Sequence, residues 1–431
     1  MIEAVSSDIS PKTSEEIHFS DLPRVQSAYP YSNERAPASM KALVLAAEAR
    51  TAYIRDIPQP VPSSIELLIR VKAIALNPID PLYVAHPLGS PGRTVGSDFA
   101  GVVVEAGCDV PVEANLCVGD EVGGFLQGAC SVNDRPGAFA ELVVAPWDLV
   151  WKISKPVAME QAAGVSLVAL TAAQAIWYRL GLQAPFAYDR DQVYQEHPDW
   201  RATHNEADGP GTTNVLIYGA STSVALYAAQ MVRLSARSSG KAIRLYGVAS
   251  EARWEFLKTE PYGYDALVDY RDLHWPERIR ELTGDVGIHY AFDCVSEGSS
   301  VERTCSTLAR NGKIAIVRSR EGGAWKAPNI SVEPSYGAVW EGLGEEVQYQ
   351  GFTVRRSPAA RGFTVAFYAW LNGCMVSALS TAPIRLMPGG LESVVQDGFQ
   401  LLGAGGMEER RVIRTEPWMR PVSAEKLVYG I

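Results

Sequence analysis

Cysteine is sparse in this 431-residue chain, and its spacing argues against two common kinds of structure. The six cysteines occur singly, and no two of them form a Cys-x-x-Cys pair. Disulfide frameworks and structural zinc sites both need cysteines at characteristic separations, so neither is indicated. Because this usage is typical of a reducing compartment, we expect a cytoplasmic protein.

Long apolar runs and an excess of positive charge are also missing. No stretch approaches the roughly 20 apolar residues of a membrane-spanning helix. The polar, Ser-rich start lacks the basic and apolar regions of a secretory signal, and we interpret residues 1–39 as a flexible leader. The formal net charge is −10, which argues against a nucleic acid or an anionic membrane as partner.

The remaining chain divides by its pattern of apolar residues. From residue 40 to about 152, short β-like runs are separated by Gly, Pro and Asp, which indicates a β-rich domain that we place at residues 40–170. Within 160–182, apolar and small residues occupy nearly every helical face, as in a helix buried between two units. From Val215 strands and helices alternate, which predicts an α/β fold with a doubly wound parallel sheet. We expect this cofactor domain to span residues 171–338.

Two further segments are less regular. The polar, aromatic stretch near 183–213 is interpreted as a long surface loop, with a disordered linker as the alternative. Beyond 339 the strand–helix rhythm fades, and we expect residues 339–431 to return to the first, β-rich domain. The sequence thus predicts a cofactor domain inserted into a discontinuous substrate domain.

Few glycines remain where a dinucleotide-binding turn is expected. The stretch "TNVLIYGASTSVALYAAQM" (213–231) has the pattern of a strand, a turn and a helix, but its turn keeps a single glycine, Gly219. The small residues after Gly219 still allow phosphates to approach the start of the helix, and hydroxyl groups add hydrogen-bond donors. The alternative is an ordinary strand-to-helix turn.

The next strand indicates which dinucleotide is preferred. NAD-binding sites place Asp or Glu at the end of this strand, where it binds the ribose 2′-hydroxyl. Here the strand in "IRLYGVASEAR" is followed by Ser250 and Arg253, which suit a 2′-phosphate and therefore favour NADPH. Glu251 argues against this preference, and Arg253 alternatively is a solvated helix charge.

Several motifs together resemble the medium-chain dehydrogenase/reductase superfamily. They are "LNPIDPLY" (76–83), "VGSDFAGVVVEAG" (95–107), "VGDEVGG" (118–124), "GAFAELVV" (137–144), "VLIYGASTS" (215–223) and the terminal "EKLVYGI". The resemblance covers nearly everything from Met40 to the C-terminus. It implies a Rossmann cofactor domain and a GroES-like substrate domain completed by the C-terminal segment.

The zinc-dependent members of that superfamily carry a Cys ligand, a Gly-His-Glu motif and a four-cysteine lobe. The corresponding stretches here read Asn77-Pro78-Ile79-Asp80 and Gly96-Ser97-Asp98, and the lobe is missing. We therefore expect no metal, and hydride addition to an already activated double bond. Among such enzymes, "HYAFDCVS" (289–296), the long loop and "SYGAVWEGLGEEV" (335–347) make the chain most similar to trans-acting enoyl reductases of fungal polyketide synthases.

This resemblance implies sets of binding residues. Those expected to contact the cofactor, NADPH, are Ile79, Asp80, Pro81, Leu82, Ala173, Leu180, Gly219, Thr222, Ser223, Val224, Ala225, Ser250, Glu251, Ala252, Arg253, Tyr270, Val317, Arg318, Val428 and Tyr429. Those expected to line the acyl chain are Gly337, Ala338, Val339, Trp340 and Glu341. An aromatic stripe such as this one is alternatively part of the core. Leu82 stands where the family commonly has Lys.

The proton donor stays open at this point. Tyr83 and His86 follow the Asn-Pro motif in the same loop, and water is a third candidate. Tyr83 is alternatively a packing residue, and a lone His such as His86 is more often a surface residue.

The resemblance also implies partners and leaves two rival functions. The expected substrate is a polyketide carried by an acyl carrier protein of a polyketide synthase, and the expected oligomeric state is a monomer. Docking an acidic carrier on a negative chain needs a local basic patch, for which Arg93 and Lys155 are candidates. The alternatives are a stand-alone NADPH-dependent quinone or enone reductase and a non-catalytic nucleotide-binding partner.

Overall fold

The computed structural model describes residues 38–205, 211–327, 330–349, 352–375, 377–407, 410 and 414–431. The predicted leader lies almost wholly outside these residues. No helix in the described part of the chain is long and apolar enough to cross a membrane.

One sheet consists of six parallel strands. In spatial order these are β10 (Ala266–Val268), β9 (Ile243–Val248), β8 (Thr213–Tyr218), β11 (Ile288–Asp293), β12 (Leu308–Ile316) and β13 (Ser335–Tyr336). Numbered along the chain, this is the order 3-2-1-4-5-6 of a Rossmann fold. The central strands are apolar and buried on both faces, as parallel strands covered by helices must be.

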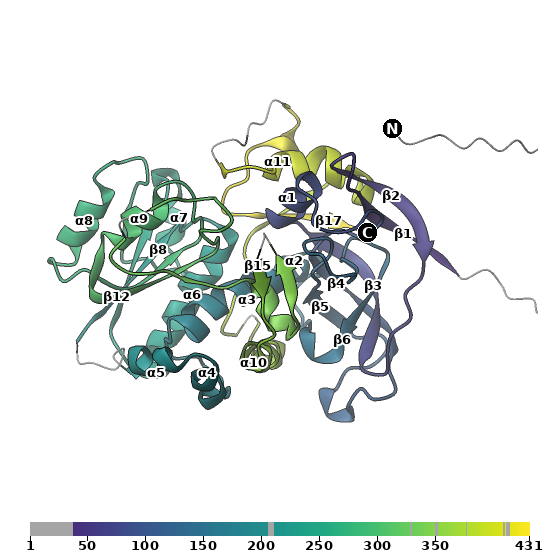
Figure 1. Cartoon of the computed structure of the whole chain (residues 1–431), viewed down its shortest axis with the longest axis horizontal. Helices are drawn as coiled ribbons and strands as arrows, with labels where there is room; N and C mark the ends of the chain where they lie inside the picture. Colours follow the sequence, from purple (N-terminus) through teal and green to yellow (C-terminus); the bar gives the residue numbers. More distant parts are fainter. Residues whose placement is uncertain are drawn as a thin grey trace, which may run out of the picture. The chain divides into compact units, whose positions relative to one another are not determined.

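Helices connect these strands (Figure 1). They are α6 (Ser223–Ser239), the 3₁₀ turn η5 (Glu251–Arg253), α7 (Trp254–Lys258), α8 (Trp275–Leu282) and α9 (Ser300–Cys305). The Thr222 hydroxyl caps the start of α6, and Gly240 in a left-handed conformation ends it. The predicted doubly wound fold is therefore confirmed.

The second large sheet is mixed and combines strands from residues 66–152 with the last two strands of the chain. Its order is β16 (Ile384–Met387), β17 (Lys426–Gly430), β3 (Glu66–Ala75), β4 (Asp98–Ala106), β5 (Glu121–Phe125) and β7 (Val150–Lys152), with β6 (Leu142–Pro146) also paired to β3. Because β17 pairs antiparallel with β3, the C-terminal segment completes the β-rich domain (Figure 1). The predicted discontinuous domain is confirmed.

Smaller elements surround this sheet. They are the hairpin β1 (Ser39–Ala46) and β2 (Thr51–Pro58), the helix α1 (Ile79–Ala85), the 3₁₀ turns η1 (Val112–Ala114) and η2 (Trp147–Leu149), the 3₁₀ turn η7 (Gly390–Ser393), the π-helical turn η8 (Val394–Phe399), α11 (Gln400–Leu402) and the 3₁₀ turn η10 (Pro417–Met419).

A buried helical segment joins the two sheets, as the sequence predicts. It consists of α2 (Met159–Ala163), α3 (Ser166–Ala173) and a π-helical stretch η3 (Gln174–Arg179). Every residue of η3 is buried, including Trp177, whose indole N–H donates to Ser235 of α6 at 2.9 Å. The apolar character on all faces therefore reflects contacts on all sides.

The segment interpreted as a long loop contains two helices, which corrects that interpretation. They are α4 (Arg190–Glu196), capped by the Asp189 side chain, and α5 (Pro198–Asn205). Helix α4 contacts α10 (Pro358–Cys374), where Glu196 accepts hydrogen bonds from Ser357 and from the Ala359 N–H. Aromatic packing between the two regions, such as Tyr188 against Phe363 at 4.9 Å, explains why the segment is structured.

The last elements lie between β13 and β16. They are the 3₁₀ turn η6 (Val339–Leu343), the hairpin β14 (Val347–Tyr349) and β15 (Phe352–Val354), and α10. Helix α10 contacts α4 and η6 as well as β7 and η2 of the β-rich domain. The domain boundaries at 170 and 338 stay predictions, because packing is continuous across them.

Candidate functional site

The predicted cofactor residues of the parallel sheet lie at one of its edges. Gly219 follows β8, Ser250 follows β9, Tyr270 follows β10 and Val317 follows β12. Since all these strands are parallel, their carboxyl ends lie along the same edge. Ligands of such sheets bind outside this edge, where the strand order reverses. Here the reversal falls between β8 and β11, beside Gly219.

The turn at Gly219 leaves space and donors for a phosphate. Gly219 has φ +71°, and a Cβ there would lie 2.6 Å from Cγ2 of Val295, so only glycine fits. Of the first four N–H groups of α6, that of Ala225 donates to the Thr222 hydroxyl at 3.2 Å, and that of Leu226 to the Thr222 carbonyl. Those of Ser223 and Val224 have no acceptor within the helix. The helix N-terminus therefore suits the pyrophosphate of a dinucleotide.

The loops expected to bind the adenosine end contain a residue that the sequence argument missed. Arg271 donates from Nη1 to the Ser250 hydroxyl at 3.0 Å, and its guanidinium lies 4.6 Å from the centre of the Tyr270 ring. Arg271 follows β10, so only the pairing of β10 with β9 brings it to Ser250. Its signal in the sequence is an arginine three residues after a short apolar strand. Glu251 is exposed.

Arg253 is partly buried beside this loop. Its Nε donates to the Ser423 hydroxyl at 3.0 Å, which is its one hydrogen bond through the side chain within the described residues. Ala252 is exposed between Arg253 and Glu251. Arg253 and Arg271 thus approach Ser250 from two different loops, one at the start of α7 and one at the end of β10.

The loop after β11 is ordered by a buried carboxyl group. Asp293 accepts hydrogen bonds from the N–H groups of Val295 and Ser296 at 2.9 and 2.7 Å, and from the Ser300 hydroxyl at 2.6 Å. Burial raises the pKa of Asp293 to about 6, against these hydrogen bonds, which lower it. The Ser296 hydroxyl in turn accepts from the Val317 N–H at 3.0 Å. This chain fixes two neighbouring loops of the candidate site.

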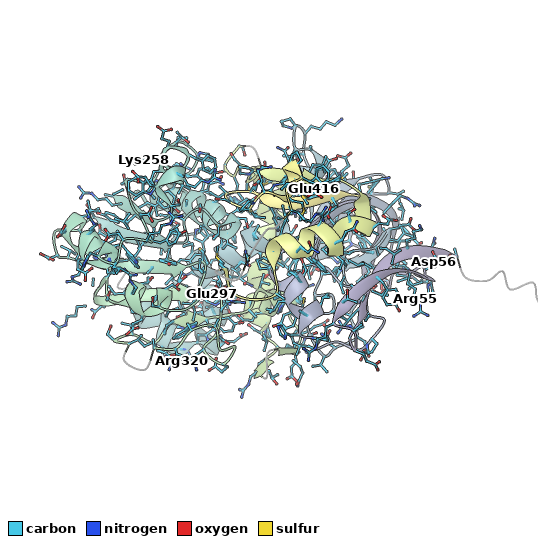
Figure 2. All side chains as sticks on the ribbon, turned by 90° about the horizontal axis from the view of Figure 1, so that it is seen from above. Arg55, Asp56, Lys258, Glu297, Arg320 and Glu416 are labelled. Atoms are coloured by element: carbon cyan, nitrogen blue, oxygen red, sulfur yellow. The ribbon has the colours of Figure 1, made fainter. Side chains whose placement is uncertain are left out.

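Arg318 is held in an ion pair. Its Nη1 lies 2.5 Å from Oε1 of Glu297, and the other carboxylate oxygen of Glu297 accepts from the Met407 N–H at 2.8 Å. Glu297, labelled in Figure 2, therefore joins the loop after β12 to the segment after α11. The sequence did not indicate this contact.

A second cluster of polar groups is buried at the start of α1. Asp80 accepts from the Asn77 N–H at 2.7 Å and from the Ser97 hydroxyl at 2.8 Å. Burial raises the pKa of Asp80 to about 7; its two hydrogen bonds lower it, and the charge of Asp98 raises it further. The Asn77 amide also donates to Asp98 at 3.0 Å.

Asp98 is fully buried and joins three parts of the chain. It accepts from the Leu167 N–H of α3 at 2.9 Å and forms an ion pair with Lys426 of β17. The Lys426 side chain is 3% exposed, so both charges depend on each other for compensation. Neither residue was among the predicted site residues.

The other residues predicted to contact the cofactor lie in the β-rich domain and in the buried helical segment, and they differ in how far they are buried. Ile79, Asp80, Pro81 and Leu82 lie in α1, and Leu82 packs partly buried against the core. Ala173, Leu180, Val428 and Tyr429 are fully buried. Their side chains contribute to the core, and their contact with a cofactor stays a prediction.

Tyr83 and His86 lie in and just after α1, a helix rather than the expected loop. Tyr83 is 3% exposed and packs in the core. His86 is exposed at the end of the helix. Their positions match the packing and surface alternatives described above, and a role in proton transfer stays a prediction.

The predicted acyl-lining segment begins at the end of β13 and is tightly packed. A Cβ on Gly337 would overlap the Arg179 guanidinium, which pairs with Glu341 at 2.7 Å. Trp340 is fully buried and stacks on Phe125 with ring centres 5.9 Å apart. Ala338 and Val339 are also buried. Trp340 is therefore a core residue, and a lining role for this segment stays a prediction.

Of the two candidate docking residues, one is corrected by the structure. Arg93 is buried, and its guanidinium donates to the carbonyls of Ser131, Gly128 and Arg135. It stabilises this loop and cannot offer its charge to a partner. Lys155 is exposed.

Among the described residues, no group of three or more His, Cys, Asp or Glu side chains could hold a metal ion.

Two family models match the two parts of the fold. "Alcohol dehydrogenase GroES-like domain" matches residues 63–155, which contain β3 to β7. "Zinc-binding dehydrogenase" matches residues 229–333, from within α6 to just before β13.

Curated relatives extend over both parts. The trans-enoyl reductase ACTTS2 of Alternaria alternata is 32% identical over 272 residues, which are 63% of this chain and 70% of that protein. The chain belongs to the medium-chain dehydrogenase/reductase superfamily. The trans-enoyl reductase thnE of Trichoderma harzianum is 28% identical over 364 residues, 84% of this chain and 92% of that protein.

Solved structures share the superfamily fold. Mycobacterial Rv1454c, solved in complex with NADPH, has a TM-score of 0.60 at 21% identity, over 91% of this chain and 100% of that chain. The CurK enoyl reductase has a TM-score of 0.64 at 18% identity, over 91% and 99%. Members of the superfamily are oxidoreductases that use NAD(H) or NADP(H), and this chain is one of them.

Proposed function

We propose that the chain is an NADPH-dependent, trans-acting enoyl reductase of a polyketide pathway in secondary metabolism. Its substrate is an α,β-unsaturated acyl thioester carried by an acyl carrier protein. The observation that carries the proposal is the Gly219 turn at the strand reversal, beside Ser250, Arg253 and Arg271. The names of its curated relatives add the reaction class.

The residues at the sheet edge suit the cofactor in two places. The free N–H groups at the start of α6 bind the pyrophosphate, because Gly219 and the small residues after it leave the approach open. Ser250, Arg253 and Arg271 bind the 2′-phosphate through a hydroxyl and two guanidinium groups. Asp293 and Ser296 keep the neighbouring loops in place for the nicotinamide end.

The chemistry divides between the cofactor and the chain. When bound, NADPH supplies a hydride to the β-carbon of the enoyl thioester, and the resulting enolate takes a proton at its α-carbon. The chain positions both reactants and excludes water, which accounts for much of such catalysis. The buried pair of Asp98 and Lys426 fixes α3 and β17 next to α1. The proton comes from Tyr83, His86 or water.

Leu82 leaves two outcomes open: reduced activity, or an enoyl reduction that does not need the lysine common in the family. Its side chain is partly buried against the core, so it contributes apolar packing at the end of the first turn of α1. Neighbouring Asp80 and Lys426 supply the polar groups of this region instead.

A single-turnover experiment tests the proposal. Enzyme and NADPH are mixed with an enoyl pantetheine thioester, with the matching free acid, or with a simple quinone, and nicotinamide absorbance is followed. We expect decay with the thioester and none with the free acid. Faster decay with the quinone favours a stand-alone quinone reductase. Binding of NADPH without decay on any substrate favours a non-catalytic nucleotide-binding partner.

A further inference from the structure

A cavity lies between the cofactor domain and the C-terminal segment. Its volume is about 260 Å³. Arg253 and Phe256 line it from the start of α7, and Arg420, Ser423 and Glu425 line it from the segment before β17. The hydrogen bond from Arg253 Nε to the Ser423 hydroxyl crosses this boundary.

The C-terminal wall of the cavity is held in shape by a buried arginine. Arg385 of β16 is 5% exposed, and its Nη1 donates to the carbonyls of Trp418 and Arg420 at 2.9 and 2.6 Å. Its Nη2 donates to the Pro421 carbonyl at 3.1 Å. Three carbonyls within residues 418–421 are thus directed at one guanidinium, which fixes the segment that bears Arg420 and Ser423.

The backbone of this wall is strained at one residue. Ala424 has φ +56°, which lies in the left-handed region. Glycine adopts this region readily, and among the other residues it is uncommon except for asparagine and aspartate. Such strain persists where surrounding contacts require it, and it is frequent at ligand sites. Here it lies between Ser423, which meets Arg253, and Glu425, which lines the same cavity.

The charges around the cavity favour an anion. Glu425 is the one carboxylate among its lining residues, and it is already paired with Arg385 and, at 2.8 Å, with Arg420. Among the lining residues, Arg253 and Arg420 bring two positive charges against one negative charge, and Arg385 behind the wall also compensates the charge of Glu425. This excess stands out in a chain whose net charge is −10. A phosphate monoester, with two charges and three acceptor oxygens, suits such a site.

We propose that this cavity binds the 2′-phosphate of NADPH, and that Arg420 and Ser423 complete the subsite opposite Arg253. The inference rests on the proposed use of NADPH. Of the residues proposed above for the 2′-phosphate, Arg253 lines this cavity, and the C-terminal segment adds a second wall opposite it. In consequence the phosphorylated cofactor fastens the C-terminal segment to the cofactor domain. NADH, which lacks the phosphate, binds without this contact.

Binding of cofactor fragments tests the proposal without any turnover. The dissociation constants of adenosine 2′,5′-bisphosphate and of 5′-AMP are measured by calorimetry for the wild type, Arg420→Gln, Ser423→Ala and Arg253→Gln. We expect Arg420→Gln and Arg253→Gln to weaken the bisphosphate roughly 10- to 100-fold, as for loss of a charge-assisted hydrogen bond. Affinity for 5′-AMP stays within about twofold. Ser423→Ala gives a smaller loss in the same direction.

Arg55→Gln is the control, because Arg55 is an exposed arginine that extends from β2 (Figure 2). It leaves both affinities unchanged, and thermal melting verifies that each variant is folded. Unchanged bisphosphate binding in folded Arg420→Gln overturns the proposal, as does a wild type that binds the two fragments equally well. Two competitors carry the same chemistry, inorganic phosphate and 4′-phosphopantetheine. The proposal is also overturned if either competitor binds more tightly than the bisphosphate and this binding is lost in Arg420→Gln.

Hydrogen exchange provides a second readout that a purely structural role would not change. We expect the bisphosphate, but not 5′-AMP, to slow exchange in the peptide that contains residues 418–425. Equal protection by both fragments contradicts the fastening of this segment. Failure of the proposed enoyl reduction is a separate result. If the protein passes these binding tests but reduces no thioester, the phosphate site is supported and only the proposed reaction is wrong.

Discussion

At the scale of single residues, Gly219 carries the strongest constraint. Its positive φ and the closeness of Val295 Cγ2 both exclude a side chain. Gly240, at the other end of the same helix, has nearly the same φ, +68°, and open space around it. Comparing substitutions at these two glycines therefore distinguishes the effect of backbone strain from the effect of steric overlap.

We predict different effects for Gly219→Ala and Gly240→Ala. Each variant loses about 1–2 kcal/mol of unfolding free energy from the left-handed conformation. Only Gly219→Ala also displaces Val295 and the turn, so it weakens NADPH binding at least tenfold. Denaturant unfolding and NADPH fluorescence titration measure the two effects. Equal NADPH affinity in both variants contradicts a phosphate site at this turn.

Asp80 offers a test based on pH. Its pKa is raised from 3.8 to about 7, so the folded state binds a proton that the unfolded state releases between these values. Stability linked to Asp80 is therefore complete below about pH 4 and is lost as pH rises to about 7. We predict that the unfolding free energy of the wild type falls relative to that of Asp80→Asn over this range, by up to about 1.4 kcal/mol per pH unit. Parallel stability curves for the two proteins would show that Asp80 is ionised when folded.

The site residues that could be predicted from the sequence are those marked by a pattern in their own stretch of chain. Gly219, Ser250 and Arg253 follow apolar strands at positions where a dinucleotide site needs small, hydroxyl and basic side chains. Arg271, Arg420 and Ser423 could not be found in this way, because strand pairing and chain return bring them to the site from distant positions. Trp340 shows the opposite difficulty, since the same aromatic pattern suits a binding wall and a core.

At the scale of elements, the pair of Asp98 and Lys426 connects β4, α3 and β17. Asp98 receives hydrogen bonds from Asn77 and Leu167 as well as the charge of Lys426. Removing one charge leaves the other buried without compensation, whereas removing both does not.

We predict that Lys426→Met lowers the unfolding free energy by about 3–5 kcal/mol. Combining Lys426→Met with Asp98→Asn recovers a large part of that loss, because the uncharged amide that replaces the carboxylate still accepts the Leu167 N–H. Chemical denaturation of the single and double variants gives the coupling energy. Additive losses would mean that the two side chains do not compensate each other.

The elements between 183 and 213 show why part of the fold was missed. Helices α4 and α5 are short and polar, so they lack the apolar stripe that indicates a helix. A capping signal was present, since Asp189 is followed three residues later by Gln192, whose N–H it accepts. The stabilising contacts come from α10, which lies far away in the sequence.

At the scale of the whole molecule, the two sheets were predictable and their joining contacts were not. The spacing of apolar runs predicted the parallel sheet and the β-rich domain, and the last strand was expected to rejoin the first domain. The contacts of Glu297 with Met407 and of Arg253 with Ser423 bring the C-terminal segment to the cofactor domain at two separate loops. Both depend on how the sheets pack, which no local pattern encodes.

Hydride transfer from NADPH to an enoyl thioester can be followed by isotope labelling. The protein is incubated with NADPH carrying deuterium at both positions of nicotinamide C4 and with an enoyl pantetheine thioester, and the product is analysed by mass spectrometry and NMR. We predict a saturated thioester with one deuterium, located at the β-carbon. A product without deuterium at that carbon, or an unchanged thioester in the presence of bound cofactor, would contradict it.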